Sequence, residues 1–289
     1  MDTIRISIKT FSGDQCLEWV APLEYDVGHL KTVIEGTLGI PSLFQRLASG
    51  TVMLRDSCAL VYYMKPGDTS LQVTVSISLD DVQRHLSSGS PQKQCCALAD
   101  LGKLGPKAGH VFNAVAACLQ DEDYAVRRAA VGALARIAEK GDRRAITTVF
   151  AYLEDEKSFV RSDALRALVQ LAPKGDHPTI MAVASCLEDT DDCVRYAAVL
   201  ALSQIAEKND QHAITAAAAC LQDEMWDVRH VAVLALKKLS DKGNQRAITA
   251  VTSCLKDENE CVKDAAVLTL SQLVEKGDQH ASTAKRRKL

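Results

Sequence analysis

Residues 94–284 repeat with a period of 34 residues. A basic residue preceded by Val recurs at this step, with an Asp six residues before it, an Ala three after it and a Leu seven after it. The columns are Arg127, Arg161, Arg195, Arg229 and Lys263; Asp121, Asp155, Asp189, Asp223 and Asp257; Ala130, Ala164, Ala198, Ala232 and Ala266; Leu134, Leu168, Leu202, Leu236 and Leu270. A fixed period of this size indicates stacked units, because one unit cannot bury its apolar face alone. The sequence therefore predicts an α-solenoid of about five units.

Each copy contains two predicted helices. After the basic residue, apolar residues follow at steps of 3, 4, 7 and 10, as at Ala232, Val233, Leu236 and Leu239, which is one face of a helix. A shorter helix, such as residues 213–221, precedes it. We name the shorter helix A and the longer one helix B. The Ala column is expected to let neighbouring helices approach closely.

Turn residues are expected to mark the ends of the helices. A Lys followed by a residue that tolerates left-handed backbone angles predicts the end of each B helix: Lys140-Gly141, Lys174-Gly175, Lys208-Asn209, Lys242-Gly243 and Lys276-Gly277. A short polar side chain is expected to cap the start of each B helix: Asp123, Ser158, Asp191, Asp227 and Asn259.

The repeated pattern, Asp, Val-Arg, Ala, Ala-Leu and an aliphatic residue, resembles the HEAT-repeat family and its short phycobilisome-lyase-type variants. Typical HEAT units are longer, about 40–47 residues. Tetratricopeptide and ankyrin signatures are missing from the sequence. The resemblance implies a right-handed α-α superhelix of the ARM/HEAT type. It also implies that the Asp column and the basic column form a ladder between neighbouring repeats.

Residues 1–78 have a different pattern. Ile4, Ile6 and Ile8 alternate with polar residues, as in a strand with one buried face. Apolar residues at helical spacing follow and stop at Gly39, and residues 71–77 alternate again. A strand, a hairpin, a helix, short strands and a final strand predict a β-grasp fold. The fold class is therefore multidomain, with an α+β domain followed by an all-α solenoid.

Two stretches, IKTFSG at 8–13 and GIPSLFQRL at 39–47, resemble ubiquitin. The resemblance places ubiquitin's hydrophobic recognition patch on Phe11, Ala48, Gln72 and Thr74, of which only Phe11 is bulky and apolar. Ubiquitin is conjugated through a free C-terminal Gly-Gly, whereas SISLDDVQRH follows the last predicted strand here. We therefore do not expect a conjugated modifier.

Four segments are expected along the chain. They are a ubiquitin-like domain at 1–78, a linker at 79–93, the solenoid at 94–284 and a basic tail at 285–289. The Ser- and Gly-containing stretch from Ser87 to Pro91 is interpreted as the flexible part of the linker. The tail residues Lys285, Arg286, Arg287 and Lys288 fit a short nuclear-import signal.

The B helices are the predicted partner-binding groove. Beside the buried Ala and Leu columns run columns that change from repeat to repeat, and in HEAT-type stacks this side is concave. Variable columns on a fixed core are a common way to encode binding specificity. Three leucines with nearby aromatic residues favour an apolar groove for a partner helix or peptide. The predicted groove residues are Arg128, Arg166, Tyr196, Leu200, Trp226, His230, Leu234, Lys237 and Leu268. The other interpretation of Trp226 and His230 is two solvent-facing residues in columns that tolerate variation.

The sequence contains few features that would indicate a catalytic or metal-binding site. The ten cysteines include no CxxC pair, and the column Cys118, Cys186, Cys220 and Cys254 is expected to be buried. Cys193 and Cys261 lie in turns and are expected to be more exposed. None of the seven histidines is followed by Glu, the dipeptide that binds iron in related helical-repeat hydroxylases. We therefore expect no catalytic residue, no cofactor and no metal.

The sequence favours a non-enzymatic scaffold or adaptor that binds a protein partner. A net charge of −3 favours neither nucleic acid nor an acidic membrane, and no apolar run is long enough for a membrane span. A cytoplasmic monomer is expected, and the basic tail leaves the nucleus open as an alternative location. Two alternatives stay open: an enzyme of the lyase-type repeat group, and a shuttle that docks on the proteasome through the ubiquitin-like domain.

Overall fold

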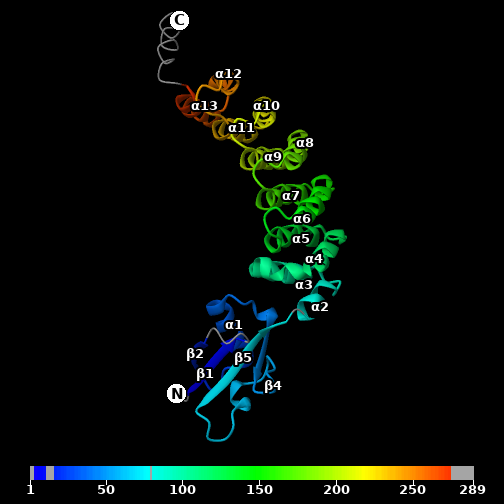
Figure 1. The fold of residues 1–289 in the computed structure, drawn as a ribbon, viewed down its shortest axis with the longest axis vertical. Helices are drawn as coiled ribbons and strands as arrows, with labels where there is room; N and C mark the ends of the chain where they lie inside the picture. The colour runs from blue at the N-terminus through cyan, green and yellow to red at the C-terminus, as the bar shows by residue number, and fades with distance from the viewer. Residues whose placement is uncertain (1–2, 11–15, 79, 275–289) are drawn as a thin grey trace, which may run out of the picture. The chain divides into compact units, whose positions relative to one another are not determined.

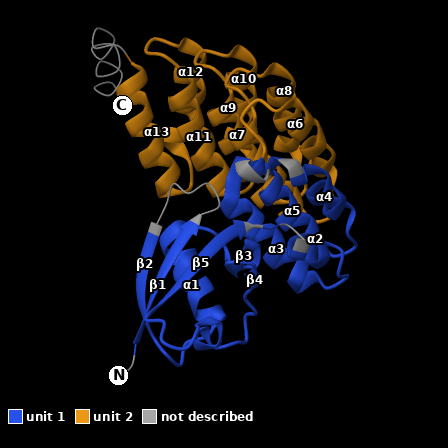
Figure 2. Cartoon of the chain, turned by 60° about the horizontal axis from the view of Figure 1, so that its bottom comes forward, with its two compact units in different colours: residues 1–137 blue, residues 138–289 orange. Residues whose placement is uncertain are grey.

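The computed structural model describes residues 3–10, 16–78 and 80–274. The chain forms two compact units, residues 1–137 and 138–289, which are coloured separately in Figure 2. The change of fold is as expected from the sequence, because a mixed β-sheet comes first and a run of helices follows (Figure 1). The four-segment division at 78, 93 and 284 stays a prediction.

Unit 1 begins with a five-stranded sheet. The strand order is β2-β1-β5-β3-β4, with β1 and β5 parallel and the other neighbouring pairs antiparallel. The parallel pair joins the two ends of the sheet segment, since Ile6 lies opposite Leu71. The strands are β1 (Thr3–Thr10), β2 (Cys16–Pro22), β3 (Gln45–Ser49), β4 (Val52–Met53) and β5 (Ser70–Ile77).

One helix, α1 (Val27–Leu38), packs against this sheet. Its start is capped by Asp26, whose carboxylate accepts a hydrogen bond from the backbone N–H of His29. It ends at Gly39, which has a φ of 67°, as the sequence predicted. Leu30 and Ile34 are buried with the alternating face of β1. This arrangement is the predicted β-grasp.

Four helices complete unit 1. They are α2 (Asp80–Leu86), α3 (Pro91–Leu104), α4 (Phe112–Ala117) and α5 (Tyr124–Ile137). The segment interpreted as a linker thus contains α2 and the start of α3. Gln94 is buried in α3 and donates hydrogen bonds to the Leu86 carbonyl (3.1 Å) and to Asp121 (2.9 Å). Lys103 lies 3.4 Å from Glu35, so α3 contacts the helix of the β-grasp.

Unit 2 alternates short and long helices. The short A helices and the long B helices form two layers, visible in Figure 2. The A helices are α6 (Arg143–Phe150), α8 (His177–Ser185), α10 (Gln211–Ala219) and α12 (Gln245–Ser253). The B helices are α7 (Ser158–Leu171), α9 (Asp192–Ile205), α11 (Trp226–Leu239) and α13 (Glu260–Leu273). Each B helix packs against the next one along the chain, as in a solenoid.

The repeated columns form the core of unit 2. The Ala column is fully buried at 164, 198, 232 and 266, and the Leu column is fully buried at 168, 202 and 236. Leu270, in the last described helix, is only partly buried. The prediction that fixed columns hold the stack together is therefore confirmed.

The predicted helix stops need correction. The B helices end at Leu171, Ile205 and their equivalents, so the Lys-Gly and Lys-Asn pairs lie in the turn beyond the last helical residue. These turn residues do adopt left-handed angles, with φ of 78° at Gly175 and 64° at Asn209. The Gly175 N–H donates a hydrogen bond of 2.7 Å to the carbonyl of Ile205, the last residue of the next B helix. The left-handed residue therefore links two repeats. The pair Lys276-Gly277 lies outside the described residues.

The predicted N-caps are correct in part. Asp191 and Asn259 cap their helices, and Asp123 accepts a hydrogen bond from the N–H of Ala125. Ser158 and Asp227 were predicted wrongly, because Ser158 is the first residue of its helix and Asp227 the second, so both lie within the first turn. In every repeat the N–H two residues after the ladder Asp bonds to that Asp, and this residue is the one just before the helix. In these two repeats it is Lys157 or Met225, whose side chains do not cap the helix.

Candidate functional site

Three ion pairs form a ladder between consecutive repeats of unit 2. Arg161 binds Asp189, Arg195 binds Asp223, and Arg229 binds Asp257, each through two nitrogen–oxygen contacts. The Nε–Oδ2 distance is 2.7 Å in all three pairs. The ladder implied by the HEAT resemblance is therefore present here. Lys263, in the last described helix, contacts Glu260 of its own helix instead.

Each ladder Asp also organises its own turn. The Oδ1 atom of Asp223 accepts a hydrogen bond from the N–H of Met225, two residues further on, at 2.9 Å. The hydrogen bond from Arg229 holds the pKa of Asp257 below its usual value, and this outweighs the opposite effect of burial. A bidentate, charged pair of this kind is a rigid joint. The ladder is therefore structural.

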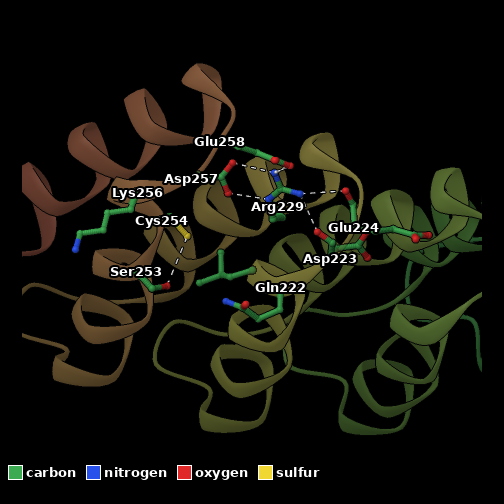
Figure 3. A pocket seen from close by; sticks show the side chains of 10 residues that line it. Gln222, Asp223, Glu224, Arg229, Ser253, Cys254, Lys256, Asp257 and Glu258 are labelled. Atoms are coloured by element: carbon green, nitrogen blue, oxygen red, sulfur yellow. Dashed lines mark hydrogen bonds and ion pairs between the residues drawn. The ribbon is translucent and has the colours of Figure 1, made fainter.

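A polar hollow of about 460 Å³ lies beside the ladder, between the repeats of α11 and α13. Figure 3 shows Arg229 at its centre, held by Asp257 and flanked by Glu258 and Glu224. A second hollow of about 360 Å³ is lined by Glu224, Met225, Trp226, Glu258 and Asn259. The two hollows share the two glutamates, so these carboxylates form a common rim.

The predicted groove residues of unit 2 lie along the B helices. Leu234 and Leu268, one repeat apart, are 41% and 62% exposed, and Leu200 in the same column is partly buried. Tyr196 is 36% exposed, and the rings of Trp226 and His230 lie 6.4 Å apart. The apolar column therefore stays accessible on consecutive helices.

The remaining predicted groove residues contribute less to this face. Arg166 is exposed and held by Asp163 of its own helix at 2.9 Å, and Lys237 is half-buried. Ser162, in the column of Tyr196, and Ser203, in the column of Lys237, are buried and unavailable to a partner. Arg128 lies on α5, which belongs to unit 1.

The sequence analysis missed the glutamates beside Trp226. Glu224 and Glu258 follow the ladder Asp in two consecutive repeats, and their side chains are 82% and 86% exposed. They lie 34 residues apart in the sequence and line the same hollow in the fold. The sequence does contain a recurring Asp-Glu pair at these positions. The two glutamates line one hollow only because the repeats stack.

The cysteine predictions are confirmed. Cys118, Cys186, Cys220 and Cys254 are buried, whereas Cys193 and Cys261 are exposed. Burial raises the pKa of the Cys118 and Cys220 thiols to about 11, which leaves them almost entirely protonated near neutral pH.

Among the described residues, one group of three possible metal ligands lies close together: Asp191, Asp192 and Cys193. Asp191 is already engaged as the N-cap of α9, where it accepts from two backbone N–H groups. The group is therefore explained by the start of the helix.

Three of the four residues predicted to form a ubiquitin-like patch lie within the described part of the chain. Gln72 and Thr74 are exposed on the same face of β5, and Ala48 on β3 is paired with Thr74. These three side chains form a polar to weakly apolar surface. Phe11 lies outside the described residues.

The columns, the alternation of helices and the ladder match a known family. The sequence profile described as HEAT repeats matches residues 81–169, 113–203, 167–237 and 214–284, which together span more than half of the chain. The chain belongs to the HEAT-repeat family. No match was found among curated protein sequences.

HEAT-like and armadillo proteins are also similar in structure. A designed armadillo repeat protein in complex with the peptide (KR)4 is 20% identical, with a TM-score of 0.51 over 68% of this chain and 99% of that one. An archaeal HEAT-like repeat protein from Thermococcus onnurineus NA1 is 19% identical, with a TM-score of 0.47 over 68% of this chain and 80% of that one. The complex of CpcE and CpcF of phycocyanin lyase from Nostoc sp. PCC7120 is 18% identical, with a TM-score of 0.43 over 55% of this chain and 98% of that one.

None of the helices within the described residues is both long and apolar enough to span a membrane.

Proposed function

We propose that the chain is a non-enzymatic interaction protein, and that the B helices of unit 2 bind a peptide or helix of a protein partner. The observation that carries this proposal is the leucine column on consecutive B helices. Leu234 and Leu268 remain exposed, whereas the core Leu236 is fully buried and Leu270 is partly buried in the same two repeats. Apolar side chains in a row on a helical surface suit the apolar face of a partner.

The binding mode has support from a protein of similar fold. The designed armadillo repeat protein was solved with a bound peptide. Stacked helical repeats offer an extended surface on which each repeat contributes a few side chains. In this chain those side chains would be Tyr196, Trp226, His230 and the leucines of the exposed column. A scaffold or adaptor role follows from such a surface.

A binding role without bond chemistry fits the available nucleophiles. The buried thiols have raised pKa values, and the exposed Cys193 thiol has its pKa raised by desolvation and by the neighbouring carboxylates. An enzyme of the lyase-type group would need a reactive group other than these cysteine thiols. Docking of the ubiquitin-like domain on the proteasome would have to use the polar surface of Gln72 and Thr74, which lacks the apolar character of the ubiquitin patch.

A capture experiment tests the groove. The full-length chain, the variant Tyr196→Ala/Leu234→Ala and a control Gln211→Ala/Arg246→Ala on exposed A-helix positions are immobilised and exposed to the same cell extract. We expect proteins that bind the wild type and the control and are lost from the groove variant, as quantified by mass spectrometry. Circular dichroism establishes that all three are folded. Identical sets of bound proteins would exclude this groove.

A further inference from the structure

The second hollow of unit 2 has an aromatic wall. Trp226 is the first residue of α11 and is 44% exposed, and it lines a space of about 360 Å³ with Met225 and Asn259. A large aromatic ring left half-exposed at a concave position can provide a stacking surface for a ligand group. The first residue of the other B helices in unit 2 is Ser158, Asp192 or Glu260, so this wall occurs at one repeat.

The rim of the hollow carries two available carboxylates. Glu224 and Glu258 contact Arg195 and Arg229 at 3.5 Å, but each guanidinium is already held at 2.7 Å by a ladder Asp. A long, exposed contact to an arginine that has a better partner contributes little. Both glutamates can therefore turn towards a ligand.

The surrounding charges favour a cation. Residues 223–227 and 257–260 together contain six carboxylates. Asp223, Asp257 and Glu260 pair with basic side chains at 2.7 Å, which leaves Glu224, Asp227 and Glu258 as the excess negative charge. The partial positive charge at the starts of α11 and α13 opposes a cation. It is offset because Asp227 and Asn259 accept hydrogen bonds from the first N–H groups of these helices, at 2.9 Å each. A ring face beside exposed carboxylates is the combination that binds an ammonium or guanidinium group.

We infer that this hollow receives a lysine or arginine side chain from a basic segment of a protein partner. Trp226 contacts the cation with its ring face, and Glu224 and Glu258 bind the charged group from two consecutive repeats. The inference rests on the proposed binding function and specifies the chemistry of the partner. The hollow lies at the turns that carry the ladder, so a cation bound there would be a polar contact in addition to the apolar column of the B helices.

The test uses the full-length chain and a fluorescent (KR)4 peptide as the probe. Binding is measured by anisotropy at low and at physiological salt. We expect Trp226→Leu to weaken binding about tenfold, because Leu retains apolar bulk without the ring face. We expect Glu224→Gln/Glu258→Gln to weaken it by about fivefold or more, with a smaller dependence on salt.

A matched control distinguishes binding at this site from non-specific attraction of the basic peptide to exposed carboxylates. The variant Glu154→Gln/Glu188→Gln removes the same charge from exposed positions of other repeats, and we expect less than a twofold change. The chain has two tryptophans, so in a Trp19→Phe background the fluorescence of Trp226 should change on titration with the peptide. Equal losses in both glutamine variants, or no change in Trp226 fluorescence, would overturn the site.

The two proposals fail in different ways. If the wild type does not bind (KR)4 while Tyr196→Ala/Leu234→Ala still loses captured proteins, the basic occupant is excluded and the apolar groove stands. If (KR)4 binds through Trp226 while the groove variant loses no captured protein, the cation subsite stands and the apolar groove is excluded.

Discussion

The N-terminal sheet and the helical solenoid of unit 2 are stabilised by contacts of different range. In the sheet, β1 pairs in parallel with β5, so residues near the start of the chain depend on residues near position 71. In unit 2, consecutive B helices pack against each other, α7 with α9, α9 with α11 and α11 with α13, and each ladder pair spans 28 residues.

This difference affects both stability and the information in the sequence. A sheet closed by one long-range strand pair is expected to unfold as a unit, whereas stacked repeats depend mainly on their nearest neighbours. Repetition also shows which positions matter, because the same side chain recurs where the same contact recurs. In the sheet each core position occurs once.

The largest effects should come from core truncation in the two regions. Leu30→Ala in α1 and Leu236→Ala in α11 remove side chains that are fully buried, and each should lower the free energy of unfolding by about 3 kcal/mol. In a hydrogen-exchange experiment, Leu30→Ala should accelerate the exchange of backbone amide hydrogens in all strands of the sheet. Leu236→Ala should act most on α9, α11 and α13. Uniform acceleration throughout unit 2 would contradict nearest-neighbour stacking.

A smaller but specific effect is expected from the ladder. Asp223→Asn leaves the nearly buried Arg195 without its bidentate partner and with only the longer contact to the exposed Glu224, and we expect a loss of about 3 kcal/mol or somewhat less in urea unfolding. The matched control is Asp241→Asn, which removes an exposed carboxylate that pairs with Lys208 at the other turn of the repeat. The control should change stability little. Similar losses in both variants would show that the ladder does not join the repeats.

The smallest effect concerns the pH dependence of the ladder. Burial raises the pKa of Asp223, but the hydrogen bonds from Arg195 and Met225 lower it by more. The folded-state pKa therefore lies below its usual value. The ionised carboxylate therefore stabilises the fold fully above the unfolded-state pKa of about 3.9. This stabilisation is lost as the pH falls through the folded-state pKa. The stability difference between wild type and Asp223→Asn should be constant from pH 7 to 5 and shrink below pH 4. A difference that grows on acidification would contradict this assignment.

The repeat made much of unit 2 predictable. The Ala and Leu columns and the buried cysteines followed from positions that recur every 34 residues, and the resemblance to HEAT repeats implied the Arg–Asp ladder. Helix boundaries were less predictable, because Ser158 and Asp227 are reasonable caps by local preference. In the structure each B helix of unit 2 starts at the same position relative to its ladder Asp, and in these two repeats the residue before the helix is Lys157 or Met225. The helix start is therefore set by the register of the repeat and not by the nearest residue with a capping side chain.

The exposed surface was predicted least well. Leu234 and Leu268 were expected at the surface and lie there, but Ser162 and Ser203, which occupy the columns of Tyr196 and Lys237 in other repeats, are buried. Whether a variable column faces solvent depends on the rotation of each helix against its neighbours. The spacing within one helix does not determine that rotation.

The sequence by itself determined the HEAT-type repeat, its period and the residues of its core, because apolar periodicity and recurrence are properties of the chain alone. The tertiary structure decided which surface residues became neighbours. Glu224, Trp226 and Glu258 line one hollow because α11 and α13 stack in register, and that proximity depends on packing between repeats.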